Sequence, residues 1–526
     1  MLTDTDADVM KPGPSRRRFL QSAALAGTAF GLGEWDGLLG FSFAGDKDAT
    51  VAPDLVGYDG EIAALARLIE ETPREKCVEL MMERFRRGMT YRQFLAALYQ
   101  AGVTAKTYYG GHSAYAVCSA HQLSLELPAH ESLLPVFWAL DAYKVSLTRY
   151  PDRNHDVTLH ALQGPLPSAE RAEDELRAGI ESQDAERAER AIVALVRAEG
   201  MTRVIDSLLH YAGRDFTFIG HKAIWVSGVC QLLQAIGWNH AEAQLRFVVR
   251  DLARHDEGML EPYAANCERV ERAIGKLPTD WARNGGNREL TADLLVMLRE
   301  GRDREACDLA VESLAHGIAT AGAVWDAVFL DAGEQIMNGN QATGAPLHAS
   351  TGANALRHAF ELSSRPKDRL LLLLQALGWM VRYRGRAVKA PRVITELTPL
   401  EIARTDRAAV DEILSTLSLG GYATPNASID YRNQDWRHDA ARKAFRFAEK
   451  FPESDLLVHS ALRVLSAKAG WDVHQIKFPV AMVRNYRWIS PEWRRHYLAQ
   501  SSYSFLGVDA PDTSMIVQLR AALKNG

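Results

Sequence analysis

Four segments of the chain place a histidine at or near the expected start of an apolar helix. These histidines are His112, His221, His348 and His474. A neutral imidazole acts as a general base or a metal ligand near neutral pH. A buried histidine bonded to a backbone carbonyl would explain any one of them alone. The recurrence of the pattern makes one shared site an equal alternative.

His474 lies in a short polar run within an apolar helical pattern. Asp472 is expected to cap this helix, because its carboxylate can accept from the first free backbone N–H groups. His474 and Lys477 are three residues apart, so both lie on one face of the helix. Pro479 predicts that the helix is short or kinked. Because inward-facing polar groups are costly unless they are paired, this run is predicted to form part of a polar site.

His112 and His221 lie in similar surroundings. Each follows a glycine in the pattern G-H-x-A, and a Gln-Leu pair follows each histidine at the same offset. This weak echo indicates two equivalent helices around a common centre, with chance similarity between two apolar helices as an equal alternative. Tyr115 shares the helix face of His112, and Trp225 lies in the same segment as His221.

His348 is surrounded by small residues, in the run LHASTGA from position 347 to position 353. Small side chains allow another helix or a ligand to approach closely. Thr351 lies about one turn after His348 on the same face of the expected helix.

The composition is that of a soluble globular protein. The chain has 526 residues, of which 47% are hydrophobic and 24% are charged, and this is enough for a large core. The net charge of -5 and the pI near 6.4 show no excess of basic residues that would favour binding to nucleic acid. No apolar run after the N-terminal segment reaches the roughly 20 residues that span a bilayer, so no transmembrane segment is expected in the mature chain.

The N-terminus carries the most specific local signal. Residues 15–21 (SRRRFLQ) resemble the twin-arginine export motif, and a mildly apolar stretch follows at 22–32. Small residues at Ser42 and Ala44 predict cleavage after Ala44. We therefore expect a signal peptide at 1–44, a linker at 45–58 and a mature domain at 59–526. The alternative is a basic N-terminal helix that stays attached.

An export signal of this type has consequences for partners and location. The twin-arginine export machinery is the expected partner, and a periplasmic or extracellular location is expected. This machinery carries proteins that are already folded, often with a cofactor inserted, which favours a bound metal or cofactor.

From about residue 59 the periodicity is helical, and no stretch has the alternation of a strand. This pattern predicts an all-α fold with a single large helical domain around a central buried site. Residues 72–75, 90–93 and 398–401 are predicted helix starts with capping residues. The charged residues 168–197 predict a solvated helix pair. Loops are expected at 164–167 and 285–286.

Nucleotide and disulfide motifs are weak in this sequence. The glycine run at 27–33 lies within the export signal and follows no strand, so flavin or nicotinamide bound by a βαβ unit is not expected. The five cysteines are scattered and form no CxxC, which argues against a zinc ribbon, a c-type haem and a disulfide framework. A single disulfide remains an alternative.

The order of the histidine segments resembles the questin oxidase-like family. The segments concerned are His112, residues 218–221 (FIGH), residues 347–356 and residues 472–477 (DVHQIK). The resemblance spans most of the mature chain and implies an all-helical fold. It also implies an oxidoreductase that opens aromatic or quinone-like rings with dioxygen in a Baeyer–Villiger-type oxygenation. NADPH supplies the electrons in this family, which has no recognised flavin-binding motif.

The resemblance further implies roles for the residues of the site. His221 or His348 would be the base, and His474 with Lys477 would stabilise an oxyanion or a peroxide. His112 and Tyr115 would orient the aromatic substrate, with Trp225 and Thr351 beside them. The export signal departs from the family, because a protein outside the cytoplasmic membrane has no ready NADPH.

Two other functions remain open. The histidines His112, His221, His348 and His474 are alternative ligands for iron, copper or haem, because imidazole suits all of these. The chain has no HxxxH, and its HxxE is formed by His358 and Glu361. The second alternative is a non-enzymatic exported helical protein that binds a hydrophobic ligand or partner. It predicts scattered histidines that no pocket joins.

Overall fold

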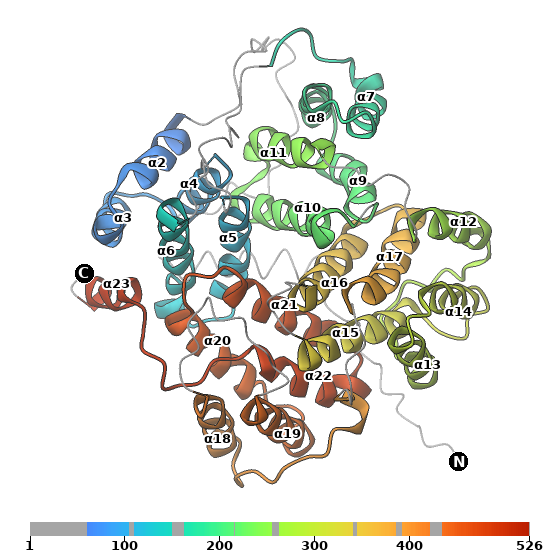
Figure 1. The fold of residues 1–526 in the computed structure, drawn as a ribbon. Coiled ribbons are helices and arrows are strands. Elements are labelled where there is room, and N and C mark those ends of the chain that lie inside the picture. Colours follow the sequence, from blue (N-terminus) through green and yellow to red (C-terminus); the bar gives the residue numbers. More distant parts are fainter. Residues whose placement is uncertain are drawn as a thin grey trace, which may run out of the picture.

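The computed structural model of the chain describes residues 60–104, 110–149, 162–214, 216–254, 262–339, 345–384, 392–420 and 434–524. These residues form 22 α-helices and no β-strand, so the all-α prediction is confirmed (Figure 1). The predicted signal peptide at 1–44 and linker at 45–58 lie outside the described residues.

The helices fall into four consecutive groups. The first comprises α2 (Gly60–Glu71), α3 (Cys77–Arg86), α4 (Tyr91–Thr104), α5 (Gly110–Ser124) and α6 (Leu134–Arg149). The second comprises α7 (Ala169–Glu181), α8 (Ala185–Ala198), α9 (Met201–Ala212), α10 (Thr217–Ile236) and α11 (Ala241–Arg254). The third comprises α12 (Tyr263–Ala273), α13 (Arg288–Arg299), α14 (Asp303–Ala315), α15 (Ala321–Asn338), α16 (Ala345–Leu362) and α17 (Pro366–Arg384). The fourth comprises α18 (Asp406–Ser418), α19 (Asp435–Lys450), α20 (Leu456–Lys468), α21 (His474–Trp488), α22 (Arg494–Ser501) and α23 (Ser514–Lys524).

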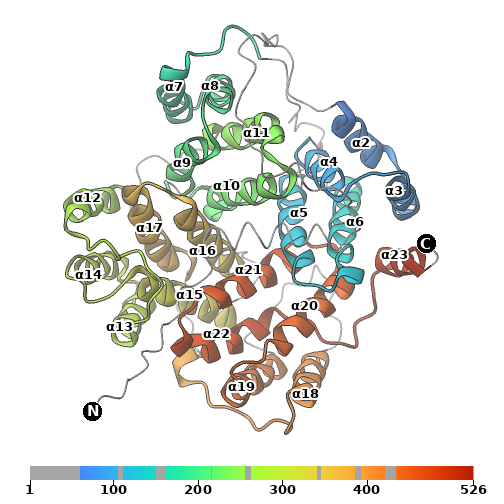
Figure 2. The same cartoon turned by 180° about the vertical axis from the view of Figure 1, so that it is seen from behind.

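Four helices, one from each group, close a ring at the centre of the molecule. Helix α5 packs against α10, α10 against α16, α16 against α21, and α21 back against α5. Figures 1 and 2 show these helices in the middle, with the other helices around them. Because α16 is buried along nearly its whole length, it is an internal helix and not an amphipathic surface helix.

One contiguous hydrophobic core joins these groups. Its largest fully buried side chains include Trp138, Trp325 and Trp379, which come from α6, α15 and α17. No described helix is both long enough and apolar enough to cross a membrane.

One predicted helix start is confirmed. The backbone N–H of Thr90 donates to Oε1 of Gln93 at 2.8 Å, and the N–H of Gln93 donates to Oγ1 of Thr90 at 3.2 Å. This reciprocal pair is a capping box at the start of α4. The charged residues 168–197 also form the predicted helix pair, α7 and α8, which lies at the edge of the molecule in Figure 1. The loops at 164–167 and 285–286 are likewise non-helical.

The other two predicted helix starts differ from the structure in different ways. A helical segment does begin at Arg74, as a 3-10 turn that runs directly into α3, but the Thr72 hydroxyl donates back to the Leu68 carbonyl at 2.6 Å and does not cap it. Residues 398–401 are not helical, because the Thr398 carbonyl accepts from the Arg442 side chain at 2.9 Å on α19. The helix starts later, at α18, where the Thr405 hydroxyl accepts from the N–H of Ala408.

The proline in α21 does not shorten that helix. Pro479 lies inside α21, which continues to Trp488. Surrounding packing offsets the missing N–H, since Phe478, Val480 and Met482 on either side are buried.

Candidate functional site

The four central helices bring the four predicted histidines together. The distance between ring centroids is 4.9 Å from His112 to His221 and 4.6 Å from His221 to His348. It is 5.6 Å from His348 to His474 and 5.5 Å from His474 back to His112. These rings form a closed set, the four-histidine cluster, with one imidazole from each of α5, α10, α16 and α21.

His221 and His348 form the tightest pair of the cluster. Their Nε2 atoms lie 3.3 Å apart, and both residues are buried, with 8% and 4% of their surfaces exposed. At this distance the Nε2–H of one ring donates a hydrogen bond to the unprotonated Nε2 of the other, and the tautomers of the two rings set its direction. The pair is therefore able to accept and return a proton within the core.

Asp472 orients His474. Its Oδ1 accepts from the backbone N–H of His474 at 3.0 Å and lies 2.9 Å from the ring Nδ1. A carboxylate accepts only, so Nδ1 carries the hydrogen and Nε2 is turned away from Asp472. This Nε2 is buried and has no hydrogen-bond partner among the described residues. Asp472 was predicted as a helix cap, and it also orients the ring, which the D-x-H spacing could have indicated.

Lys477 supplies a positive charge beside the cluster. Its Nζ lies 3.5 Å from Nδ1 of His112, and the residue is 4% exposed. Burial lowers the pKa of Lys477 to about 8, although Asp472 opposes this effect. Burial also holds the pKa of His112 well below its usual value, and the charge of Lys477 lowers this pKa further. At neutral pH the cluster therefore combines a neutral imidazole with an ammonium group.

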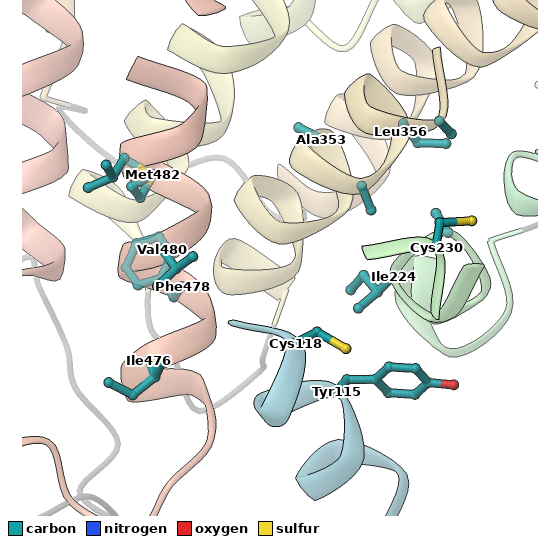
Figure 3. Close-up of a cluster of buried hydrophobic side chains, with 14 of the residues drawn as sticks. Tyr115, Cys118, Ile224, Cys230, Ala353, Leu356, Ile476, Phe478, Val480 and Met482 are labelled. Atoms are coloured by element: carbon teal, nitrogen blue, oxygen red, sulfur yellow. The ribbon is translucent and has the colours of Figure 1, made fainter. Parts of the chain in front are cut away.

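The predicted substrate-binding residues lie at different depths. The ring of Trp225 is 5.8 Å from that of His221, so Trp225 borders the cluster. Tyr115 stacks on Trp225 at 6.0 Å, which places it one layer behind. The Thr351 hydroxyl donates to the Leu347 carbonyl at 3.1 Å within α16. Figure 3 shows apolar residues of the same helices, including Cys118 on α5, packed where these helices meet.

The backbone just before His221 adopts an uncommon conformation. Ile219 has φ of +53° and Gly220 has φ of +81°. A β-branched residue at positive φ is rare and costs about 1–3 kcal/mol, so the surrounding structure must hold it. Strain of this kind clusters at functional sites. Sequence reasoning missed it, although the glycine before His221 was a signal.

Replacing Gly220 by alanine is expected to destabilise the fold by about 1–3 kcal/mol. The added Cβ would overlap the Tyr383 hydroxyl, and alanine disfavours positive φ. Urea unfolding followed by circular dichroism measures the change. Gly275→Ala is the matched control, because a Cβ there meets nothing within 4 Å. Equal stability of the two variants would contradict the expectation.

A further histidine lies in the core outside the cluster. Nδ1 of His358 is 2.9 Å from Oγ of Ser227, and Gln231 donates to the same hydroxyl at 3.1 Å. Glu361 instead forms an ion pair with Arg357. The HxxE pattern of His358 and Glu361 is therefore not a pair of metal ligands.

The five cysteines are all free thiols, and four of them are buried. Cys118 donates to the Gly228 carbonyl at 3.2 Å, so it links α5 to α10. Burial raises the pKa of Cys118 and of Cys230 to about 12, so both thiols stay protonated.

As the side chains stand, the described residues contain no group of three or more His, Cys, Asp or Glu side chains that could hold a metal ion. Comparison of the chain with protein-family models, with curated proteins and with solved structures gives no match. The resemblance to the questin oxidase-like family therefore remains a prediction that depends on the order of the histidine segments.

Proposed function

We propose that this chain is an oxidoreductase that uses dioxygen to oxygenate an electron-rich aromatic molecule, a phenol or a hydroquinone. The observation that carries the proposal is the buried His221–His348 pair, with Nε2 atoms 3.3 Å apart, in a cluster whose His112 lies 3.5 Å from the Lys477 ammonium group. A proton acceptor and a fixed positive charge in a low-dielectric site are what formation of a phenolate requires.

In the proposed reaction, the unprotonated Nε2 of the pair accepts the phenol proton. The ammonium group of Lys477 stabilises the phenolate, and His474 keeps its orientation through Asp472. A ring carbon of the phenolate then forms a bond to dioxygen, and the imidazolium returns its proton to the resulting peroxide anion. The substrate supplies both electrons, so this step needs no NADPH and suits a protein that works outside the cytoplasmic membrane.

The aromatic neighbours favour a flat substrate. Trp225 borders the cluster and is itself supported by the ring of Tyr115, which makes a rigid stacking surface. We propose that an aromatic ring binds against Trp225 with its hydroxyl group toward His221. Apolar packing around the cluster favours a planar, weakly polar molecule over a sugar or a peptide.

Oxygen uptake with a panel of hydroquinones and anthrahydroquinones tests this function. The purified protein is expected to accelerate uptake above autoxidation and to carry label from ¹⁸O₂ into the product, because the peroxide is bonded to a ring carbon of the substrate. Uptake at the autoxidation rate for the whole panel, or a product without label, would refute the proposal.

Metal binding is a second candidate, and two observations favour it. The 3.3 Å separation of the His221 and His348 Nε2 atoms is close to the spacing of about 3.4 Å between two imidazole ligands of a tetrahedral ion. His474 also has a buried Nε2 without a partner and a carboxylate behind its other nitrogen, as metal-bound histidines do.

The side chains of the described residues do not complete such a site in their present positions. The ligands would be His112, His221, His348 and His474, and a bound ion would supply Lewis-acid or redox chemistry. Elemental analysis with an absorption spectrum of the exported protein separates the candidates. A stoichiometric metal or a haem band would refute the cofactor-free form of the proposal.

The non-enzymatic alternative expected the histidines to lie apart, whereas the structure brings them together. We propose that the protein is exported by the twin-arginine route before it acts, on the basis of residues 15–21. Cell fractionation tests this: replacement of Arg16 and Arg17 by lysine is expected to leave the protein in the cytoplasm. Unchanged export of that variant would refute this route.

A further inference from the structure

The Tyr383 hydroxyl lies between two histidine-bearing helices. Tyr383 belongs to α17 and is 2% exposed. Its hydroxyl donates to the Ile219 carbonyl at 3.1 Å, two residues before His221 on α10. The hydrogen bond therefore acts directly on the left-handed turn formed by Ile219 and Gly220.

Both neighbouring helices make room for this hydroxyl with a glycine. A Cβ atom on Gly220 would overlap it, and a Cβ on Gly352 would lie 2.6 Å from it. Gly220 directly precedes His221, and Gly352 lies one helical turn after His348. The same oxygen thus contacts the backbone next to both members of the buried histidine pair.

The ring of Tyr383 has little freedom to move away. Phe216 lies 4.8 Å from it at an angle of 58°, and Trp379 packs against Phe216 at 5.5 Å. Burial raises the pKa of the Tyr383 hydroxyl, so it stays protonated and remains a donor. A phenylalanine would fill the same space and remove only this donor.

We infer that Tyr383 is a positioning residue that sets the geometry of the His221–His348 pair. Its hydroxyl holds the Ile219 carbonyl and so holds the strained turn from which His221 projects. Without the hydroxyl, the Ile219 carbonyl loses a partner and the turn relaxes toward ordinary helix, which moves His221 away from His348. This inference rests on the proposed function for its catalytic meaning, but the geometry itself can be tested without activity.

Tyr383→Phe is the test variant, and Tyr143→Phe is the matched control. Tyr143 is a buried tyrosine of α6 whose hydroxyl has no partner among the described residues. Hydrogen–deuterium exchange at the imidazole C2 position, followed residue by residue with mass spectrometry, gives the pKa of each histidine. Tyr383→Phe is expected to shift the pKa of His221 and of His348 by about one unit. Tyr143→Phe is expected to leave both values unchanged.

A rescue variant separates positioning from general destabilisation. Ile219→Gly removes the conformational strain, so the double variant Ile219→Gly with Tyr383→Phe is expected to return both pKa values toward those of the native protein. Wild-type pKa values in Tyr383→Phe, or equal shifts in Tyr143→Phe, would overturn the inference. If Tyr383→Phe fails to fold, the double variant still tests the inference. The inference requires that the double variant folds and that His221 and His348 have native pKa values in it.

The pH profile of oxygen uptake separates failure of the proposed function from failure of the positioning role of Tyr383. If the wild-type protein shows no uptake, the proposed function fails while the exchange measurement still tests Tyr383. If uptake occurs and its pH profile is the same in Tyr383→Phe as in the wild type, the proposed function stands and the positioning role fails.

Discussion

Replacing His348 by asparagine is expected to lower the rate of oxygen uptake by about 10²–10⁴-fold, the usual contribution of general acid–base catalysis. Asparagine keeps a polar side chain beside His221 but cannot accept a proton from the substrate. The Nε2 of His348 faces that of His221 at 3.3 Å, so the change removes one member of the proton-accepting pair. Uptake measured with an oxygen electrode, at saturating hydroquinone, gives the effect.

His316→Asn is the control for this loss. His316 is exposed and directly follows the last residue of α14, where its Nδ1 lies 3.0 Å from the Glu312 carbonyl, and it has no place in the cluster. Circular dichroism must show that both variants are folded. A wild-type rate for His348→Asn, or an equal loss in the control, would remove His348 from the proposed reaction.

Replacing Lys477 by methionine is expected to abolish the activity and to stabilise the protein at neutral pH. The pKa of Lys477 falls from 10.5 to about 8 because the ammonium group is buried. At 1.36 kcal/mol per pKa unit, this difference costs the fold about 3 kcal/mol. Methionine has a similar length and no charge to bury. A buried charge kept at such a cost fits a functional group better than a structural one.

The pH dependence of the unfolding free energy shows whether the buried charge of Lys477 destabilises the fold. Between pH 8 and pH 10.5 the unfolded lysine binds more protons than the folded one, so stability rises with pH in this window. The penalty is present in full below pH 8 and disappears toward pH 10.5. Urea unfolding at pH 7 and pH 9.5 is expected to show this rise in the wild type and a smaller one in Lys477→Met.

A second buried lysine is the matched control. Lys144 on α6 donates to the carbonyls of Ile69 and Glu70 at 3.1 and 2.7 Å, so Lys144→Met is expected to destabilise the protein and spare the activity. The wild-type oxygen uptake is also expected to fall above about pH 8, as Lys477 loses its charge. Destabilisation by Lys477→Met at pH 7 would contradict this expectation and would show that the contact of Lys477 with His112 outweighs the cost of burying the charge.

Local sequence patterns were sufficient for the fold class and for the identity of the candidate residues. Helical periodicity reflects contacts three and four residues apart, so the sequence alone determined an all-α chain, the α7–α8 pair and the capping box at Thr90. The four histidines were recognised because each polar ring interrupts an apolar helical pattern. The prediction was wrong at residues 398–401, because a distant contact competes there with local helix propensity. The Arg442 side chain donates a hydrogen bond to the Thr398 carbonyl.

Only the tertiary structure decided how these residues meet. His221 and His348 are 127 residues apart in sequence, and Lys477 and His112 are 365 apart, so no local pattern determines their distances. The closed ring of α5, α10, α16 and α21 brings them together, and the positions of Gly220 and Gly352 allow Tyr383 between two of these helices. The sequence by itself determined which side chains are candidates for the site. Packing between segments far apart in the chain decided which of them lie within hydrogen-bond distance and which are shielded from water.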